Sequence, residues 1–363
     1  MSALKTLEDI TPLAIHGVES GTPVVVAGPC SAETERQTID TARALNALGI
    51  KIFRAGVWKP RTRPGDFEGM GEEALRWIAE LRPRYPHLRF AAEVASPAHL
   101  ELCLKYGIDA VWIGARTSGN PFSVSELCEA MRGVSIPVLV KNPLIPDIKL
   151  WAGAIERVRN AGIADVAAVH RGFYLDNNLG YRNNPLWKIP IELKRQHPDL
   201  PLFCDPSHIC GKAELVAKVA QTATDLSFDG LMIETHPAPA DALTDARQQL
   251  TPLPLSQLIA ELRIPVKGNA LPDEMQLLRH EIDTIDEELL QLLLQRNSVS
   301  LKIAEIKRAN NLPVLQLDRW EKLLQSHLAQ AEAMGLSAEY VRRIFEEIHA
   351  ESVRLQNEAL HKE

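Results

Sequence analysis

This 363-residue sequence lacks three features: a regular cysteine framework, an apolar run long enough to span a membrane, and an excess of positive charge. Its 5 cysteines are an odd number at irregular spacing, which is typical of a reducing cytoplasm and not of a disulfide framework. No apolar run approaches the length of a membrane span, and the start, Met1-Ser-Ala-Leu-Lys5, carries no charged-then-apolar signal. The net charge of −7 argues against nucleic acid as a main partner. We therefore expect a cytoplasmic protein that binds neither nucleic acid nor membranes.

Glycine nearly disappears from the last quarter of the chain, where only Gly335 follows Gly268, and the β-branched runs end there too. Leucine and isoleucine instead recur at helical spacing from Leu277 to Ile306. Two further helices are predicted at Asp318–Met334 and Ala338–Leu360, with Ser337 as an N-cap. Residues 273–363 should therefore form an all-α helical domain, separated by a linker at 266–272 from what precedes it.

The predicted helices are too long to bury their apolar stripe within one small subunit. We expect the helical domain to dimerise, which would make the protein a homodimer or a homotetramer.

Residues 1–265 alternate short apolar runs with amphipathic stretches. Most of the runs are continuously apolar, which is typical of parallel strands covered on both faces. The expected strands are Val24–Ala27, Lys51–Ala55, Phe90–Val94, Ala110–Ile113, Pro137–Val140, Val166–Val169, Leu202–Cys204 and Gly230–Ile233. The expected helices are Glu35–Leu48, Glu72–Arg82, Pro97–Tyr106, Ser123–Met131, Trp151–Asn160, Pro185–Gln196, Lys212–Thr224 and Asp241–Arg247. Such alternation predicts an α/β fold, a (β/α)₈ TIM barrel. A doubly wound open sheet is the alternative, but no glycine fingerprint for a dinucleotide follows the first strand.

A basic turn follows the second expected strand, with Arg54, Lys59 and Arg61 close to Thr62. Clustered cations repel one another unless an anion lies among them, and guanidinium groups grip phosphate oxygens in pairs. Because chemistry in barrel enzymes collects at the carboxyl ends of the strands, this turn predicts a phosphate site.

The other expected strands also end in polar groups, which form two sets. Cys30, His208, Glu234 and Asp245 supply a thiolate, an imidazole and two carboxylates, a mixture that suits Mn, Fe, Zn or Co better than Mg. The simpler reading makes Cys30 a small buried hydrophobe and His208 a helix cap. The second set is cationic and could hold two phosphorylated anions: Arg54, Lys59, Arg61, Arg116, Lys141 and Arg171. Weaker candidates, as hydrogen-bond partners of the site, are His170, His236 and Asp205.

A family resemblance joins these residues. The motifs are Ala27-Gly-Pro-Cys30, Lys59-Pro-Arg-Thr62, Gly114-Ala-Arg-Thr117, Lys141-Asn142, His170-Arg-Gly172, Asp205-Pro-Ser-His208 and Glu234-Thr-His-Pro237. In this order, between about Val24 and Leu250, they resemble type I-beta 3-deoxy-D-arabino-heptulosonate 7-phosphate (DAHP) synthase. The resemblance implies condensation of phosphoenolpyruvate with erythrose 4-phosphate on a single divalent metal ion, Mn before Fe, Co or Zn.

The resemblance also implies roles for individual residues. The metal ligands fall on Cys30, His208, Glu234 and Asp245, and phosphoenolpyruvate would be held by Arg54, Lys59, Arg116, Lys141 and Arg171. Pro60, Arg61 and Thr62 would meet erythrose 4-phosphate, with Arg63 where the family more often has serine. Condensation needs a Lewis acid on the carbonyl oxygen and a proton donor to the forming alkoxide. Lys59, between the two phosphate sites, is the candidate donor.

Polar residues interrupt the apolar faces of the predicted helical domain: Arg279, Arg296, Lys307, Arg319, Ser352 and Gln356. Together with Leu278-Arg-His-Glu-Ile-Asp283 and Leu317-Asp-Arg319, they resemble an AroQ-type chorismate mutase over about Pro272–Leu360. That family rearranges chorismate to prephenate without a cofactor, and the resemblance implies contacts to chorismate from all six residues. Arg279 (from the partner subunit), Arg296 and Arg319 would hold its carboxylates, while Lys307 and Gln356 would donate to the ether oxygen. Gln316 and Trp320 stand where that family usually has acidic residues near the substrate hydroxyl.

We therefore expect a bifunctional enzyme of aromatic amino acid biosynthesis whose mutase domain also mediates feedback inhibition by prephenate or chorismate. In one alternative, the helical tail only regulates and dimerises a DAHP synthase. In another, the barrel is a 3-deoxy-octulosonate 8-phosphate synthase, against which the Lys-Pro-Arg-Thr turn and the tail both argue.

Overall fold

The computed structural model describes residues 23–59, 65–175, 180–265 and 273–361. Two compact units divide the chain, Met1–Lys267 and Gly268–Glu363. The expected linker at 266–272 lies outside the described residues, as do Pro60, Arg61, Thr62 and Arg63. None of the described helices is long and apolar enough to cross a membrane.

Among the described residues of the first unit, eight parallel strands close into a barrel, in the order β1 to β8 with β8 pairing β1, as predicted. The strands are β1 (Val24–Gly28), β2 (Ile52–Ala55), β3 (Arg89–Val94), β4 (Ala110–Ile113), β5 (Val138–Lys141), β6 (Val166–His170), β7 (Leu202–Cys204) and β8 (Gly230–Glu234). Alternate side chains on each strand face opposite ways, so the barrel interior and the layer under the helices both need apolar residues. The interior is filled by Val26, Ile52, Ala91, Trp112, Leu139, Ala167, Val169, Phe203 and Met232.

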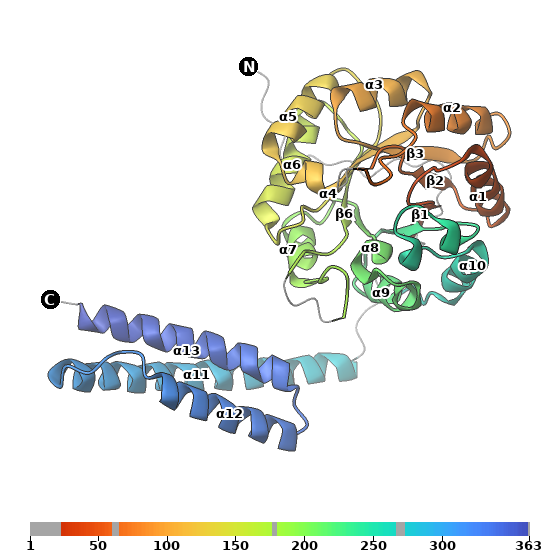
Figure 1. The fold of residues 1–363 in the computed structure, drawn as a ribbon. Coiled ribbons are helices and arrows are strands. Elements are labelled where there is room, and N and C mark those ends of the chain that lie inside the picture. The colour runs from red at the N-terminus through yellow and green to blue at the C-terminus, as the bar shows by residue number, and fades with distance from the viewer. Residues whose placement is uncertain (1–22, 60–64, 176–179, 266–272, 362–363) are drawn as a thin grey trace. The chain divides into compact units, whose positions relative to one another are not determined.

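Helices surround the strands (Figure 1). They are α1 (Glu35–Ala47), α2 (Glu72–Leu81), α3 (Pro97–Lys105), α4 (Ala115–Ser118), α5 (Pro121–Ala130), α6 (Ile148–Asn160), α7 (Lys188–Gln196), α8 (Pro206–Cys210), α9 (Ala213–Asp225) and α10 (Pro252–Glu261). Thr34, Ser96 and Asp147 begin three of them by accepting a hydrogen bond from a backbone N–H of the first turn. Their apolar faces pack on the outer strand surface in one large core.

The predicted helix at Asp241–Arg247 is wrong. Two short 3₁₀ turns, η2 (Pro239–Asp241) and η3 (Ala246–Gln248), flank an irregular loop there, and the helix after β8 is α10. Asp245 has φ 47° and ψ 34°, a left-handed backbone that no right-handed helix contains. Helical spacing of apolar residues is a weak signal over so short a stretch, and the loop's own contacts decided the outcome.

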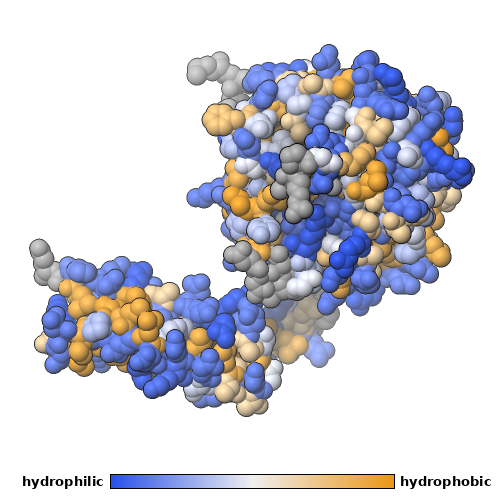
Figure 2. All heavy atoms as spheres, viewed as in Figure 1, coloured by the Kyte–Doolittle hydropathy of each residue, from blue (hydrophilic) through white to orange (hydrophobic). Residues whose placement is uncertain are grey.

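Three helices make up the described part of the second unit: α11 (Asp273–Ala309), α12 (Leu317–Ala333) and α13 (Ala338–Leu360). Ser337 caps α13 by accepting from the Tyr340 N–H at 3.3 Å, and Gly335 has a φ of +74° where the chain turns, as predicted. The buried residues shared by α12 and α13 form only a small apolar cluster of Leu324, Leu328, Ala331 and Val341. Many apolar side chains of α11 remain exposed, and Figure 2 shows hydrophobic residues on the surface of this unit.

Candidate active sites

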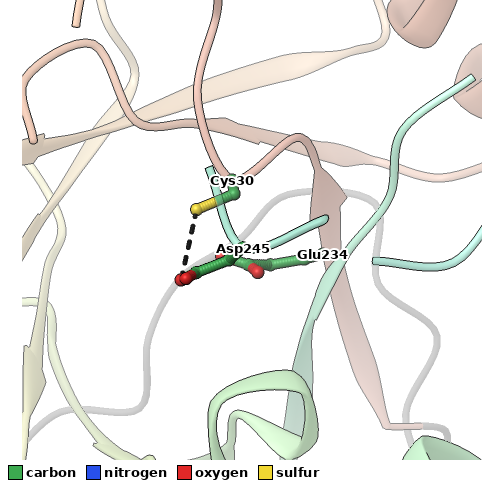
Figure 3. Close-up of side chains that lie close together, drawn as sticks. All are labelled: Cys30, Glu234 and Asp245. Carbon is green, nitrogen blue, oxygen red and sulfur yellow. Dashed lines mark hydrogen bonds between the residues drawn. The ribbon is translucent and has the colours of Figure 1, made fainter. Parts of the chain in front are cut away.

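Three of the four predicted metal ligands lie together at the carboxyl ends of the strands. One ligand atom from each of Cys30, Glu234 and Asp245 lies within 4.8 Å of the others (Figure 3). His208 completes the group, because its Nε2 lies 3.7 Å from Glu234 Oε1 and 3.8 Å from Asp245 Oδ2. Thiol, imidazole and carboxylate together match the donors that borderline divalent metals prefer, so the residues present fit such an ion.

Two backbone features position these ligands. Gly28 pairs with Glu234 across the β1–β8 seam, which places the turn carrying Cys30 beside that carboxylate. Gly28 has a φ of +149°, and a Cβ there would lie 2.0 Å from the carbonyl oxygen of Arg54, so only glycine fits. Asp245 takes the left-handed conformation described above, which costs energy for a residue other than glycine and is typical of functional sites.

The electrostatics of the cluster also favour a bound cation. Burial and then the Glu234 carboxylate raise the pKa of the Cys30 thiol to about 12. Burial alone would raise the pKa of Glu234 as well, but His208 and Arg54 lower it below its ordinary value. The pKa of Asp245 is lowered against burial by His208 and Arg182. Two ionised carboxylates therefore lie beside a protonated thiol whose metal-binding form is the thiolate.

Sequence reasoning missed the residues that hold these ligands. Gln248 is 1% exposed, and its Nε2 donates to Glu234 Oε2 at 2.7 Å. Gln249 accepts from the Cys30 N–H at 3.0 Å and donates to the Thr244 carbonyl at 2.9 Å. Arg182 lies 3.0 Å from Asp245 Oδ1. The only sequence signal for the glutamines is that two adjacent amides precede the apolar start of α10, which is too common to interpret.

Two predicted phosphoenolpyruvate ligands are buried cations. Arg54 is 1% exposed and lies 3.2 Å from Glu234, while Lys141 donates to Asp205 Oδ2 at 2.6 Å. Both lie over the ring of Trp112, which occupies the barrel interior. Arg54 Nε has no hydrogen-bond partner among the described residues, so this guanidinium retains a donor.

Asp205 proves to be a central hydrogen-bond partner in the site. Its Oδ1 accepts from the His208 N–H at the start of α8, and its Oδ2 lies 2.8 Å from His208 Nδ1. Burial opposes ionisation of Asp205, but His208 and Lys141 hold its pKa well below the usual value. Burial lowers the pKa of His208, and Asp205 only partly offsets it, so the imidazole is neutral near pH 7, as a metal ligand must be.

A cavity of about 650 Å³ opens beside the cluster. Cys30, His208 and Asp245 line it together with four predicted cations: Lys59, Arg116, Lys141 and Arg171. Arg171 is held by Asn183, which accepts from its Nη1 at 2.7 Å. Glu93, Arg182 and Asn183 also line the cavity and were not predicted as site residues.

The two weaker histidine candidates lie elsewhere. His170 is completely buried among Trp151, Phe173, Trp187 and Phe228, and burial lowers its pKa to about 3. It follows Val169, whose side chain is inside the barrel, so His170 faces the helices. His236 Nδ1 accepts from the Ala238 N–H, and its Nε2 lies 4.0 Å from Glu33. Of the three predicted hydrogen-bond partners His170, His236 and Asp205, only Asp205 contacts a residue of the ligand cluster.

The helical unit has its own cavity of about 250 Å³, which lies between α11, α12 and α13. Five of the six predicted mutase residues line it: Arg296, Lys307, Arg319, Ser352 and Gln356. Lys307 Nζ donates to Gln356 Oε1 at 2.9 Å, and Arg296 Nη1 donates to Ser352 Oγ. Arg279 is exposed on α11 and does not line this cavity. Its predicted role belongs to a second subunit and stays a prediction.

Comparison with known proteins identifies both units. Residues 12–263 match the DAHP synthetase I family, and residues 278–357 match chorismate mutase type II. The chain belongs to the DAHP synthetase I family. It resembles the type I-beta members and carries a C-terminal chorismate mutase type II domain, which makes it a bifunctional enzyme of aromatic biosynthesis.

Individual proteins similar to each unit agree with these family matches. A phospho-2-dehydro-3-deoxyheptonate aldolase of Thermotoga maritima is 30% identical over 68% of this chain and 70% of its own length. The crystal structure of a DAHP synthase from that organism superposes with a TM-score of 0.63 at 29% identity, covering 69% of this chain and 72% of that one. For the helical unit, a bifunctional chorismate mutase/prephenate dehydratase of Buchnera aphidicola is 32% identical over 25% of this chain and 23% of its own.

Proposed function

We propose that residues 1–265 condense phosphoenolpyruvate with erythrose 4-phosphate to give DAHP and phosphate, and that residues 273–363, beyond a linker at 266–272, rearrange chorismate to prephenate. The observation that carries the first activity is a single cavity in which a thiol–imidazole–carboxylate cluster meets four cations. An enol phosphate and a sugar phosphate repel each other, and such a cationic cavity offsets that repulsion.

Cys30, His208, Glu234 and Asp245 would hold one divalent ion, Mn in preference to Fe, Co or Zn. The donor set and the low pKa values of both carboxylates support this assignment. When bound, the ion would supply a Lewis acid for the carbonyl of the aldehyde substrate.

The cations divide between the two substrates. Arg54, Lys59, Arg116, Lys141 and Arg171 would bind phosphoenolpyruvate, the buried members from beneath and Arg116 from the exposed rim. Pro60, Arg61 and Thr62 would bind erythrose 4-phosphate. Lys59 would protonate the alkoxide formed in the condensation. Burial opposes its charge, yet its pKa lies above the ordinary lysine value, and the Glu93 carboxylate is among the groups that raise it, so Lys59 is protonated near pH 7 and able to donate.

An assay of both activities on the same protein, with and without EDTA, tests the function of the barrel. The whole chain should consume phosphoenolpyruvate and erythrose 4-phosphate in the presence of metal, and EDTA should abolish that reaction alone. A 2-dehydro-3-deoxyphosphooctonate aldolase of Desulfotalea psychrophila is 26% identical over 73% of this chain. An eight-carbon product needs a five-carbon sugar phosphate beside phosphoenolpyruvate, so a pentose 5-phosphate belongs in the same assay. Faster turnover of the pentose phosphate would contradict the assignment.

In the mutase cavity, Arg296 and Arg319 would hold the two carboxylates of chorismate, with Arg279 of a second subunit. Lys307 and Gln356 would donate to the ether oxygen, where charge builds in the transition state, and Ser352 would orient Arg296. No nucleophile or cofactor is needed for this rearrangement. We also propose that the exposed apolar face of α11 pairs with that of a second subunit, giving a homodimer or homotetramer.

The helical unit would also regulate the barrel, if prephenate or chorismate bound to it favours one state of the enzyme. Protein truncated after Val266 should then be an active synthase that prephenate no longer inhibits. If the tail is instead only regulatory, the whole chain should be inhibited by prephenate without converting chorismate.

A further inference from the structure

We propose that His349 contacts the substrate in the mutase cavity and accepts a hydrogen bond from the ring hydroxyl of chorismate through its neutral imidazole. The inference rests on the proposed function of the helical unit and adds a residue to it. His349 lies outside both sequence motifs of the helical domain, Leu278–Asp283 and Leu317–Arg319.

His349 has a fixed place in the cavity wall. The ring lies on α13 and stacks on the indole of Trp320 from α12, with centroids 4.0 Å apart and planes 9° from parallel. Both residues line the cavity that contains Arg296 and Lys307. His349 Nε2 is buried and has no hydrogen-bond partner among the described residues. An unpaired buried polar atom is costly, and a ligand that pairs with it recovers that cost.

The other polar groups of the cavity are largely committed to one another. Ser352 Oγ accepts from Arg296 and donates to the Ile348 carbonyl. Gln356 Oε1 accepts from Lys307, and its Nε2 donates to Ser300 Oγ at 3.0 Å. Arginine and lysine have no acceptor to offer. Among the lining side chains, His349 and Gln316 therefore remain as uncommitted acceptors for a hydroxyl proton.

Charge decides the protonation state of the imidazole. The charged groups that line the cavity are Arg296 and Lys307 from α11 and Arg319 from α12, and no carboxylate of the described residues lines it. Burial, then Arg296 and Lys307, lower the pKa of His349 below the ordinary histidine value. At neutral pH the ring is uncharged, with one nitrogen as donor and the other as acceptor.

Chorismate offers two carboxylates, an ether and one hydroxyl. The cations match the carboxylates and the ether oxygen, which leaves the hydroxyl as the group that needs a neutral acceptor. His349 is a better acceptor for the hydroxyl than Gln316. Gln316 is exposed, so its amide would lose bound water and conformational freedom on binding the substrate. Stacking on Trp320 has already oriented His349.

The test compares two histidines that stack between α12 and α13. His349→Phe keeps an aromatic ring on Trp320 but removes the nitrogens. His327→Phe is the matched control, because His327 stacks on Phe345 at 4.1 Å but does not line the cavity. We expect His349→Phe to raise the KM for chorismate about tenfold with kcat nearly unchanged, as loss of a uniform binding contact does. His327→Phe should leave both unchanged, and His349→Gln, which restores an acceptor, should recover most of the loss.

An analogue with hydrogen in place of the ring hydroxyl, assayed as a competitive inhibitor, identifies the group contacted. The reference is the same inhibitor with the hydroxyl retained. Wild-type protein should bind the analogue about tenfold more weakly than this reference, whereas the analogue should bind wild type and His349→Phe with equal affinity. Equal binding of both inhibitors by wild-type protein would overturn the inference without any variant. So would an unchanged KM in His349→Phe, or the same loss in Gln316→Leu instead. A wild-type chain with no chorismate turnover would refute the proposed function itself.

Discussion

Gln248 donates to Glu234 across 2.7 Å in the buried floor of the barrel site, and Arg182 donates to the same amide's Oε1 at 2.7 Å. Arginine only donates, so its presence fixes which end of the amide faces the carboxylate. The guanidinium of Arg182 also reaches Asp245. One arginine and one glutamine thus hold both carboxylates of the proposed metal site in place.

Replacing Gln248 should therefore weaken metal binding. Gln248→Leu leaves Glu234 without its donor, and loss of such an outer hydrogen bond typically lowers metal affinity about 10- to 100-fold. Titration of metal-free protein with Mn or Co measures the affinity directly. Gln221→Leu on α9, outside both the ligand cluster and the cavity beside it, serves as the control and should bind as wild type does. Equal affinity of Gln248→Leu and wild type would show that the hydrogen bond does not organise the site.

Removing the metal should separate the two activities. EDTA treatment, or Cys30→Ala, should abolish condensation, because the proposed Lewis acid is lost, while chorismate rearrangement continues at the wild-type rate. Both rates are measured on the same preparation. Full condensation by Cys30→Ala after exhaustive dialysis against EDTA would refute the metal assignment.

Lys307→Ala should lower kcat for the rearrangement by about two orders of magnitude or more, the usual loss when one preorganised transition-state donor is removed. Arg296→Ala should act similarly. Lys302→Ala, on the exposed side of the same helix, is the control for general effects on α11. Condensation should survive all three changes, and an unaffected mutase rate in Lys307→Ala would place the site elsewhere.

The mutase should lose activity at alkaline pH earlier than an ordinary lysine would deprotonate. Burial lowers the pKa of Lys307, and only the protonated ammonium can donate, so kcat/KM should fall as pH rises through that lowered pKa. Lys307→Arg keeps its proton at high pH and should lose this alkaline fall, even if its plateau is lower. Identical alkaline profiles for the two proteins would assign the titration to another group.

A charge on the exposed face of α11 should dissociate the proposed dimer. Ile285→Glu places a carboxylate where the apolar stripe would be buried between subunits, which is strongly unfavourable. Sedimentation velocity should show a smaller species, with mutase activity lost because the partner's Arg279 is withdrawn. Leu253→Glu, at another exposed apolar position on α10, should change neither. A wild-type chain that sediments as a monomer would contradict the proposal at once.

The local pattern of apolar and polar residues was enough to predict the strands and the polar residues at their ends. Short apolar runs, most of them continuous, predicted every strand to within one residue at each end, because a parallel strand buried on both faces is built mainly from apolar residues. The same reasoning placed polar residues at strand ends, where barrel sites form. It failed at 241–247, where helical spacing was outweighed by the left-handed backbone of Asp245.

Closure of the barrel decided which distant residues come together in the site. It pairs β1 with β8 and thereby joins Cys30 to Asp245, which are 215 residues apart. The loop after β8 returns to pair Leu250 with Thr235, and this brings Gln248 to Glu234. Whether a polar residue at a strand end faces the cavity or the helices also depends on its register in the sheet, which is why adjacent His170 and Arg171 have different environments. The sequence by itself determined which chemical groups are available and on which elements. Only the tertiary structure decided which of them meet, because contacts between distant segments follow from packing and not from local spacing.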